Sequence, residues 1–268
     1  MPDDRGGAAP MRLGWLSTGR GTGSRGLLEA TLHAIDARKL NASFEFVFMN
    51  RVRGEGEGSD AFMDLVEGRG IPLVRLSSRQ FRREHDRRPW SELRNEYDRA
   101  ALELLEPYNP DICVAAGYML IAPLLCRHFT ILNLHPALPG GPIGMWDRVI
   151  WELIERGAEE TGNMINVVTE EVDGGPVVSY CRFPIRGERF DPLWEQLAGR
   201  SVADLQAEEA QELPLFREIR AAGVERERPL LVATLAAVAE GRIDPKAART
   251  EDALDMTGEV ERMVAADG

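Results

Sequence analysis

Short apolar runs alternate with segments of helical periodicity over the first half of the chain. The runs lie at 12–16, 44–48, 71–76, 111–117 and 131–135. Between them, apolar residues recur every three or four positions over 28–35 and 93–105, which is typical of helices with one buried face. Strands without polar alternation are typical of parallel sheets covered on both faces. The pattern therefore predicts an α/β fold: a Rossmann-like, mostly parallel twisted sheet with helices on both faces.

The second half of the chain changes in character after Pro184. Two more strands are predicted at 164–169 and 176–184, followed by helical patterns over 205–219 and 229–239. The charged stretch 77–89 is expected to be a solvated loop. We therefore divide the chain into four parts: a disordered N-terminal extension at 1–10, an α/β domain at 11–185, a helical C-terminal extension at 186–249, and an acidic tail or loosely docked helix at 250–268.

Composition restricts the kinds of partner. The chain has 32 Lys and Arg against 44 Asp and Glu, a formal net charge of -12, which disfavours binding to nucleic acid. It contains no apolar run long enough to cross a membrane, and its first residues do not resemble a signal peptide, so a cytoplasmic protein without a membrane partner is expected. The three cysteines, Cys113, Cys126 and Cys181, are too scattered for a disulfide framework or a metal site, and we expect reduced, buried thiols. A small-molecule partner fits best.

A glycine-rich loop follows the first predicted strand. Residues 19–26 read GRGTGSRG and lead into a predicted helix. The loop lacks the Gly-Lys-Ser/Thr of a Walker A motif and matches the dinucleotide fingerprint only loosely. No matching acidic residue ends the second strand, which argues against a nicotinamide cofactor. Backbone N–H groups at a helix N-terminus nevertheless suit a phosphate group.

Three polar residues at the ends of predicted strands could carry chemistry. Asn133 and His135 are two apart on one strand, so their side chains share a face, and the loop 136–142 that follows contains three prolines and two glycines. Asp173 lies in an Asp-Gly-Gly turn between two strands, which by itself is ordinary hairpin chemistry. A lone histidine is also commonly structural.

Together these residues offer an amide donor for a developing oxyanion, a proton carrier, and a carboxylate that orients the imidazole. That set suits acyl transfer without a covalent intermediate. Metal chemistry is not expected, because no pair of histidines has ligand spacing.

Four sequence segments resemble one enzyme family. LSTGRGTGSRGLLEA, NPDICVAAGYMLIAP, LNLHPALP and TGNMINVVTEEVDGGPVV, in this order, resemble the glycinamide ribonucleotide formyltransferases of the folate-dependent formyltransferase superfamily. The resemblance covers roughly 11–185, and the C-terminal helices only weakly. Asn-x-His followed about forty residues later by Asp-Gly-Gly-Pro is typical of that superfamily.

The resemblance implies transfer of a formyl group from 10-formyltetrahydrofolate, the co-substrate, to the primary amine of glycinamide ribonucleotide in purine biosynthesis, with no metal. It implies that the catalytic triad is Asn133, His135 and Asp173. The implied substrate-phosphate site is Gly21, Thr22, Gly23 and Ser24, with Arg25 where the family usually has Asn. The implied folate-pocket lining is Tyr118, Met119, Leu120, Ile121, Glu170, Glu171 and Val172. Glu209 is implied to bind the substrate ribose, within the C-terminal extension that would complete the acceptor site.

Departures from the family pattern leave the acceptor open. Leu120 replaces a usual Arg, Ala137 replaces a usual Ser, and the loop 140–146 lacks the usual polar and basic residues. The same triad serves formyltetrahydrofolate hydrolases, which generally carry an N-terminal regulatory domain, and amino-sugar N-formyltransferases. Formylation of initiator methionyl-tRNA is disfavoured by the acidic C-terminal region. A non-catalytic folate- or nucleotide-binding protein is a further alternative. The expected partners are a folate and a phosphoribosyl amine, and a homodimer is left open.

Overall fold

The structure is a computed structural model that describes residues 9–118, 120, 123–171 and 173–267. The chain forms two compact units. The first unit is Met1–Ile131 with Leu235–Arg242, and the second is Leu132–Thr234 with Ile243–Gly268.

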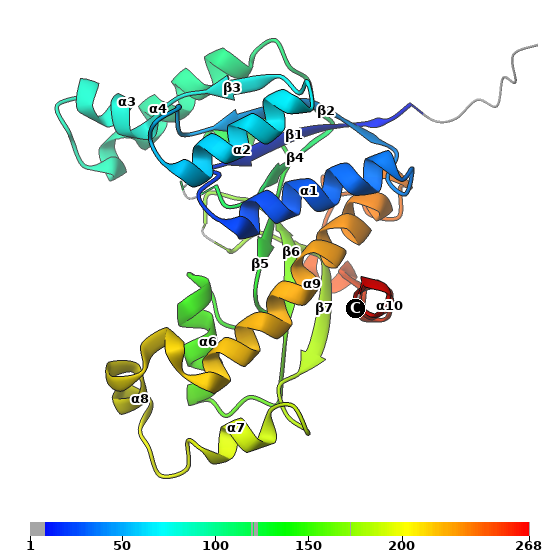
Figure 1. The fold of residues 1–268 in the computed structure, drawn as a ribbon. Coiled ribbons are helices and arrows are strands. Elements are labelled where there is room, and N and C mark those ends of the chain that lie inside the picture. Colours follow the sequence, from blue (N-terminus) through cyan, green and yellow to red (C-terminus); the bar gives the residue numbers. More distant parts are fainter. Residues whose placement is uncertain (1–8, 119, 121–122, 172, 268) are drawn as a thin grey trace, which may run out of the picture. The chain divides into compact units, whose positions relative to one another are not determined.

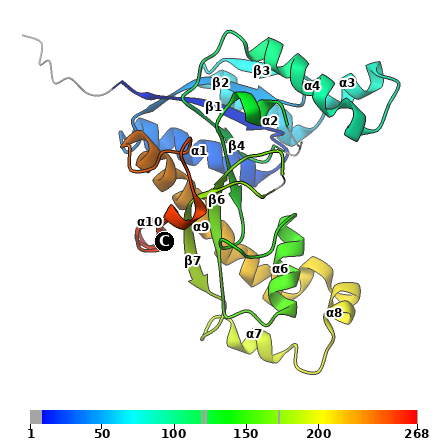
Figure 2. The same cartoon turned by 180° about the vertical axis from the view of Figure 1, so that it is seen from behind.

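The first unit contains a parallel sheet. Its strands are β1 (Met11–Ser17), β2 (Ala42–Met49), β3 (Leu73–Arg75) and β4 (Ile112–Ala115), in the order β3-β2-β1-β4. Helices α1 (Thr22–Asp36), α2 (Glu57–Gly68), α4 (Trp90–Leu105) and α5 (Leu125–His128) lie between or after them, and Figure 1 and Figure 2 show the unit from two sides. Right-handed crossovers place α1 and α2 on one face of such a sheet and α4 on the other. The predicted α/β class is confirmed.

Helix α3 (Ser78–Glu84) corrects the prediction of a loop over 77–89. The side chain of Ser77 accepts a hydrogen bond from the backbone N–H of Gln80 at 3.0 Å, which satisfies one of the free donors at the helix N-terminus. Phe81 is buried and its ring packs edge-on against that of Tyr97, with centroids 5.2 Å apart. One capping residue and one apolar anchor fold the segment into a helix, although its other side chains are mostly charged.

The strands of the second unit pair mostly antiparallel. Its strands follow the order β5-β6-β7-β8, where β5 is Ile131–His135, β6 is Glu160–Val167, β7 is Val177–Pro184 and β8 is Leu254–Asp255. The pairs β5/β6 and β6/β7 are antiparallel, whereas β7/β8 is parallel. The turn that contains Asp173 therefore joins two neighbouring antiparallel strands, as its Asp-Gly-Gly sequence suggested.

The remaining elements of the second unit are helical. They are α6 (Trp146–Glu155), α7 (Asp191–Glu195), α8 (Val202–Glu208), η1 (Ala210–Glu212), α9 (Pro214–Ala239), η2 (Thr250–Asp252) and α10 (Thr257–Asp267). The last residues of α9, from Leu235 onward, belong to the first unit. The helical pattern over 205–219 is thus divided, because Pro214 begins a new helix at a position where its missing N–H costs nothing. Helix α10 packs onto the unit through Val260, which is buried together with Met256. Of the two expectations for 250–268, the structure has the docked helix.

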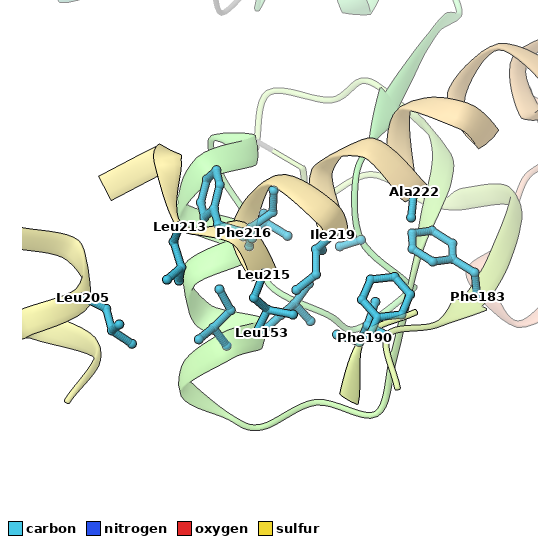
Figure 3. Packing of buried hydrophobic residues seen from close by; sticks show 14 residues of the cluster. Leu153, Phe183, Phe190, Leu205, Leu213, Leu215, Phe216, Ile219 and Ala222 are labelled. Carbon is cyan, nitrogen blue, oxygen red and sulfur yellow. The ribbon is translucent and has the colours of Figure 1, made fainter. Parts of the chain in front are cut away.

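A hydrophobic cluster fixes α6 within the second unit. Val149, Ile150 and Leu153 of α6 pack with residues of α9, including Leu215 and Phe216 (Figure 3). Burying large side chains of this kind contributes about 1.5–3 kcal/mol each. Because α6 begins directly after the loop 140–145, the cluster also holds one end of that loop.

Two of the cysteines lie in the first unit and one in the second. Cys113 and Cys181 are buried as expected, whereas Cys126 is half-buried. Among the described residues, no helix has both the length and the apolar character required to span a membrane.

Candidate functional site

Asn133 and His135 occupy the C-terminal end of β5, in the second unit. In the antiparallel pair with β6, Asn133 lies opposite Asn166 and His135 lies opposite Met164. The Asn133 side-chain amide donates a hydrogen bond to Oδ1 of Asn166 at 3.3 Å. Because alternate residues of a strand project to the same side, the Asn133 amide and the His135 imidazole share one face of β5.

The His135 imidazole is enclosed and faces an oxygen on each side. Its side chain is 3% exposed. Nε2 lies 2.9 Å from the carbonyl oxygen of Pro142, and Nδ1 lies 3.7 Å from Oδ1 of Asp173. A carbonyl oxygen can only accept, so Nε2 must carry the proton in this contact. The Asp173 carboxylate lies on the Nδ1 side of the ring, where it can orient the imidazole.

Asp173 is placed by a tightly closed hairpin loop between β6 and β7. The loop is closed by the N–H of Val167, which donates to the carbonyl oxygen of Pro176 at 2.9 Å. A side chain at Gly175 would put its Cβ 1.7 Å from the carbonyl oxygen of Val167, so only glycine fits there. Asp173 itself has φ 54°, a left-handed conformation that is uncommon outside glycine, asparagine and aspartate. The carboxylate is consequently held at 13% exposure beside His135.

The loop 140–145 contacts both His135 and Asp173 through its backbone. Pro142 provides the carbonyl oxygen at Nε2, and the N–H of Gly144 donates to Oδ2 of Asp173 at 3.1 Å. The side chains of Ile143 and Met145 instead project outward, at 58% and 52% exposure. Sequence reasoning noted the prolines and glycines but missed these two contacts, because a backbone carbonyl or amide leaves no residue-type signal.

The glycine loop lies in the first unit and opens α1. Gly21 is the N-cap, no side chain caps the helix, and the first turn has no acidic residue. A Cβ added at Gly21 or Gly23 would meet no atom within 4 Å, so the space in front of the first turn is open. Thr22 is exposed and Ser24 is half-buried, with its Oγ donating to the carbonyl oxygen of Gly21 at 3.0 Å. These features suit an anion at the N-terminus of a 15-residue helix.

Arg25 is engaged within its own helix. Its Nε lies 2.8 Å from a carboxylate oxygen of Glu29, one turn along α1, and both side chains are nearly half exposed. Exposed pairs of this kind are weak, so the guanidinium can exchange this partner for a phosphate group at little cost.

The segment after β4 lies against the glycine loop. Gly117 has φ 67°, and a Cβ there would fall 2.9 Å from Cβ of Ser24. The N–H of Thr18 donates to the carbonyl oxygen of Gly117 at 3.2 Å. Within the first unit, the predicted phosphate loop and the start of the predicted folate segment are therefore adjacent.

Tyr118 directs its hydroxyl inward. The ring lies 6.2 Å from that of Phe48, and the buried hydroxyl has no hydrogen-bond partner among the described residues. Burial raises the pKa of Tyr118 well above its ordinary value. Leu120 is half-buried. The other predicted folate residues after β4, Met119 and Ile121, lie outside the described residues.

The remaining predicted site residues belong to the second unit. Glu170 and Glu171 are exposed in the hairpin loop, where the carbonyl oxygen of Glu171 accepts from the N–H of Gly174 at 3.3 Å. Val172 lies outside the described residues. Glu209 follows α8, and its carboxylate lies 2.6 Å from Nη1 of Arg200.

The described residues include the buried thiols of Cys113 and Cys181. They contain no group of three or more His, Cys, Asp or Glu side chains arranged to hold a metal ion. Burial raises the pKa of the Cys181 thiol to about 11 and that of Cys113 further still. Neither thiol is therefore prone to form the thiolate that acts as a nucleophile.

Known proteins resemble the chain in sequence and in fold. The family model described as "Formyl transferase" matches residues 21–190. The phosphoribosylglycinamide formyltransferase of Escherichia coli is 30% identical over 169 residues, which cover 62% of this chain and 70% of that enzyme. The enzyme of the same name from Dictyostelium discoideum is 29% identical over 181 residues, covering 63% and 82%.

Two solved structures show the shared fold. Glycinamide ribonucleotide transformylase 1 from Symbiobacterium toebii matches with a TM-score of 0.64 at 20% identity, over 91% of this chain and 94% of that one. A formyltetrahydrofolate deformylase from Pseudomonas syringae matches with a TM-score of 0.61 at 20% identity, over 88% and 63%. At such identities the likeness concerns the fold, which transferases and deformylases have in common.

Proposed function

Because the chain belongs to the formyl transferase family, we propose that it transfers a formyl group from 10-formyltetrahydrofolate to the primary amine of glycinamide ribonucleotide. The observation that carries the proposal is the enclosed pair of His135 and Asp173, 3.7 Å apart, with Asn133 on the same strand. The names of the relatives in Escherichia coli and Dictyostelium discoideum support this acceptor.

The three side chains have complementary roles in the proposed reaction. The folate supplies the formyl carbonyl that the amine attacks. The Asn133 amide donates a hydrogen bond to the formyl oxygen as negative charge develops there. His135 takes the proton released by the attacking amine and returns it to the nitrogen that leaves, while Asp173 stabilises the charged imidazole. The amine adds to the formyl carbon to give a tetrahedral intermediate, and the bond to the folate nitrogen then breaks, releasing tetrahydrofolate; no bond to the enzyme forms, so no covalent enzyme intermediate is required.

The loop 140–145 must move for His135 to act in this way. Nε2 donates to the carbonyl oxygen of Pro142 in the structure, and Nδ1 faces Asp173. Neither ring nitrogen is open to a substrate amine. Glycines at positive φ, Gly140 at 76° and Gly144 at 103°, border the segment and allow backbone rotation that other residues resist.

Each predicted binding residue is assigned to the chemical group that it would contact. The N-terminus of α1, with Gly21 to Ser24 and Arg25, suits the phosphate of a phosphoribosyl amine. Glu209 would bind the ribose hydroxyls after leaving Arg200. Tyr118, Leu120, Glu170 and Glu171 would contact the folate.

An assay of tetrahydrofolate release, with and without glycinamide ribonucleotide, tests the proposal. Release that requires the amine and yields the formylated product is expected. Release in the absence of any amine would instead identify a hydrolase, like the deformylases that share the fold. If no tetrahydrofolate is released either with or without glycinamide ribonucleotide, the proposed acceptor is wrong and amino sugars are the next compounds to assay.

A matched pair of variants connects this activity to the site. Asp173→Asn is expected to abolish most of the turnover. Asp147→Asn, which removes a carboxylate from the first turn of α6, is the control and should retain it. Equal activities in the two variants would contradict the role given to Asp173.

A further inference from the structure

Four arginine side chains line one cavity in the first unit. Arg79, Arg82, Arg83 and Arg87 are exposed and line a half-open cavity of about 440 Å³, and they come from α3 and from the turn that follows it. The N–H of Arg87 donates to the carbonyl oxygen of Arg82 at 2.8 Å, which folds the turn back against the helix. Residues 79–88 contain five arginines and two carboxylates, so the segment is strongly basic within an acidic chain.

The turn that gathers these arginines adopts an unusual backbone conformation. Asp86 and Arg87 have φ values of 54° and 55°, in the left-handed region that L residues seldom occupy twice in succession. The Arg82 guanidinium braces the turn by donating to the carbonyl oxygens of Arg88 at 3.1 Å and Arg87 at 3.4 Å. A strained conformation that is held in place by neighbouring groups is a common feature of binding sites.

No carboxylate of the described residues is paired with the arginines around the cavity. In the part of the chain that the structure describes, none of the four guanidiniums has a carboxylate oxygen within 4.0 Å. Arg88, just outside the cavity, is by contrast paired with Glu96 at 2.8 Å. Arg79 donates only to the backbone carbonyl of Glu55, at 3.0 Å. Like charges gathered in this way repel one another until an anion is bound.

We propose that this arginine pocket binds a small ligand that carries several closely spaced phosphate or carboxylate groups. Guanidinium groups match both kinds of anion because they can donate two parallel hydrogen bonds to either. The volume lies within the range of small-molecule sites. The net charge of -12 disfavours a broad nucleic-acid surface. Two sources share the required chemistry: a phosphate-rich metabolite and a chain of carboxylates such as oligoglutamate.

Calorimetric titration of the full chain with tripolyphosphate, and separately with a pentaglutamate peptide, tests the proposal at low and at near-physiological salt. At least one probe is expected to bind with one molecule per chain. The double variant Arg83→Gln/Arg87→Gln should weaken that binding at least about tenfold, because two charge-assisted contacts are lost. No folate or amine is present, so the outcome is independent of the proposed formyl transfer.

The matched control is Arg38→Gln/Arg228→Gln, which removes two other exposed arginines. Arg38, at φ 57°, reproduces the left-handed backbone of Arg87, and the control also removes two positive charges. The control should bind the probe as the unmodified chain does. Tighter binding of tripolyphosphate would identify a phosphate-rich ligand as the source, and tighter binding of pentaglutamate would identify a carboxylate chain.

Two results would overturn the proposal: no binding of either probe, or equal weakening in the two double variants. Thermal unfolding checks that the variants are folded. If the Arg83→Gln/Arg87→Gln variant is not folded, the single variant Arg83→Gln replaces it in the titrations. Arg83 makes no hydrogen bond or ion pair among the described residues, so its loss leaves the turn intact.

Discussion

Replacing Asp173 by Asn tests the proposed stabilisation of a charged His135 imidazole by the Asp173 carboxylate. The substitution keeps the shape of the side chain and removes its charge. Its amide oxygen can still accept from the N–H of Gly144, which lies 3.1 Å from the carboxylate in the structure. Asparagine also tolerates the φ of 54° at this position better than other residues except glycine. The fold should therefore be preserved, with a change in Tm of only a few degrees.

The expected loss of activity follows from the distance between the two groups. Opposite charges at 3.7 Å interact by about 4 kcal/mol at an effective dielectric constant near 20. If that stabilisation is present when His135 is charged in the transition state, its loss lowers kcat by about 10³-fold. Steady-state turnover with saturating substrates measures the effect. A loss of less than about tenfold with an unchanged Tm would refute the idea that Asp173 stabilises the charged imidazole.

Three further predictions concern the stability of the two units. Gly175→Ala should lower the free energy of unfolding by up to about 3 kcal/mol in urea titrations, because the new Cβ would lie 1.7 Å from the carbonyl oxygen of Val167; an unchanged midpoint would contradict this. Phe216→Ala should cost about 3–5 kcal/mol by the same measurement, whereas a loss below about 1 kcal/mol would show that the cluster is loosely packed. Burial raises the pKa of Asp98 above its value in the unfolded chain, which is near 4. The contribution of Asp98 to the free energy of unfolding is therefore full below about pH 4 and is lost as the pH rises through the higher pKa of the folded state. The free energy of unfolding of Asp98→Asn, relative to that of the unmodified chain, should therefore rise between pH 4 and neutrality. Urea titrations in which the difference between these two free energies does not change with pH would exclude this.

The strands could be predicted from the sequence because buried parallel strands require apolar residues on both faces. The run 111–117 has no polar residue after its first, and it contains β4. Helix α3 could not be predicted in the same way, because Phe81 is its one large apolar residue and its periodicity is therefore invisible. The signal that could have identified it is local: Ser77 followed three positions later by Gln80 is the pattern of a capping box.

The side chains of the candidate site were recognisable, but their environment was not. Asn133, His135 and Asp173 stand out because polar residues at strand ends are unusual and their types suit proton transfer. That His135 and Asp173 lie 3.7 Å apart depends on the pairing of β5 with β6, which spacing alone does not reveal. The arginine pocket illustrates the same limit. Its arginines are visible in the sequence, but the left-handed turn at 86–87 that brings them together could not be predicted, because it contains no glycine.

In the loop 140–145, backbone groups contact the proposed catalytic pair of His135 and Asp173. These contacts use the carbonyl oxygen of Pro142 and the N–H of Gly144. The φ of Gly144, 103°, favours glycine at that position. The side chains of Ile143 and Met145, in contrast, are exposed. Because the two hydrogen bonds use backbone groups of other residues, exchanging Ile143 and Met145 should leave the bonds to His135 and Asp173 in place. These two side chains are therefore the first positions to exchange when the proposed acceptor is tested.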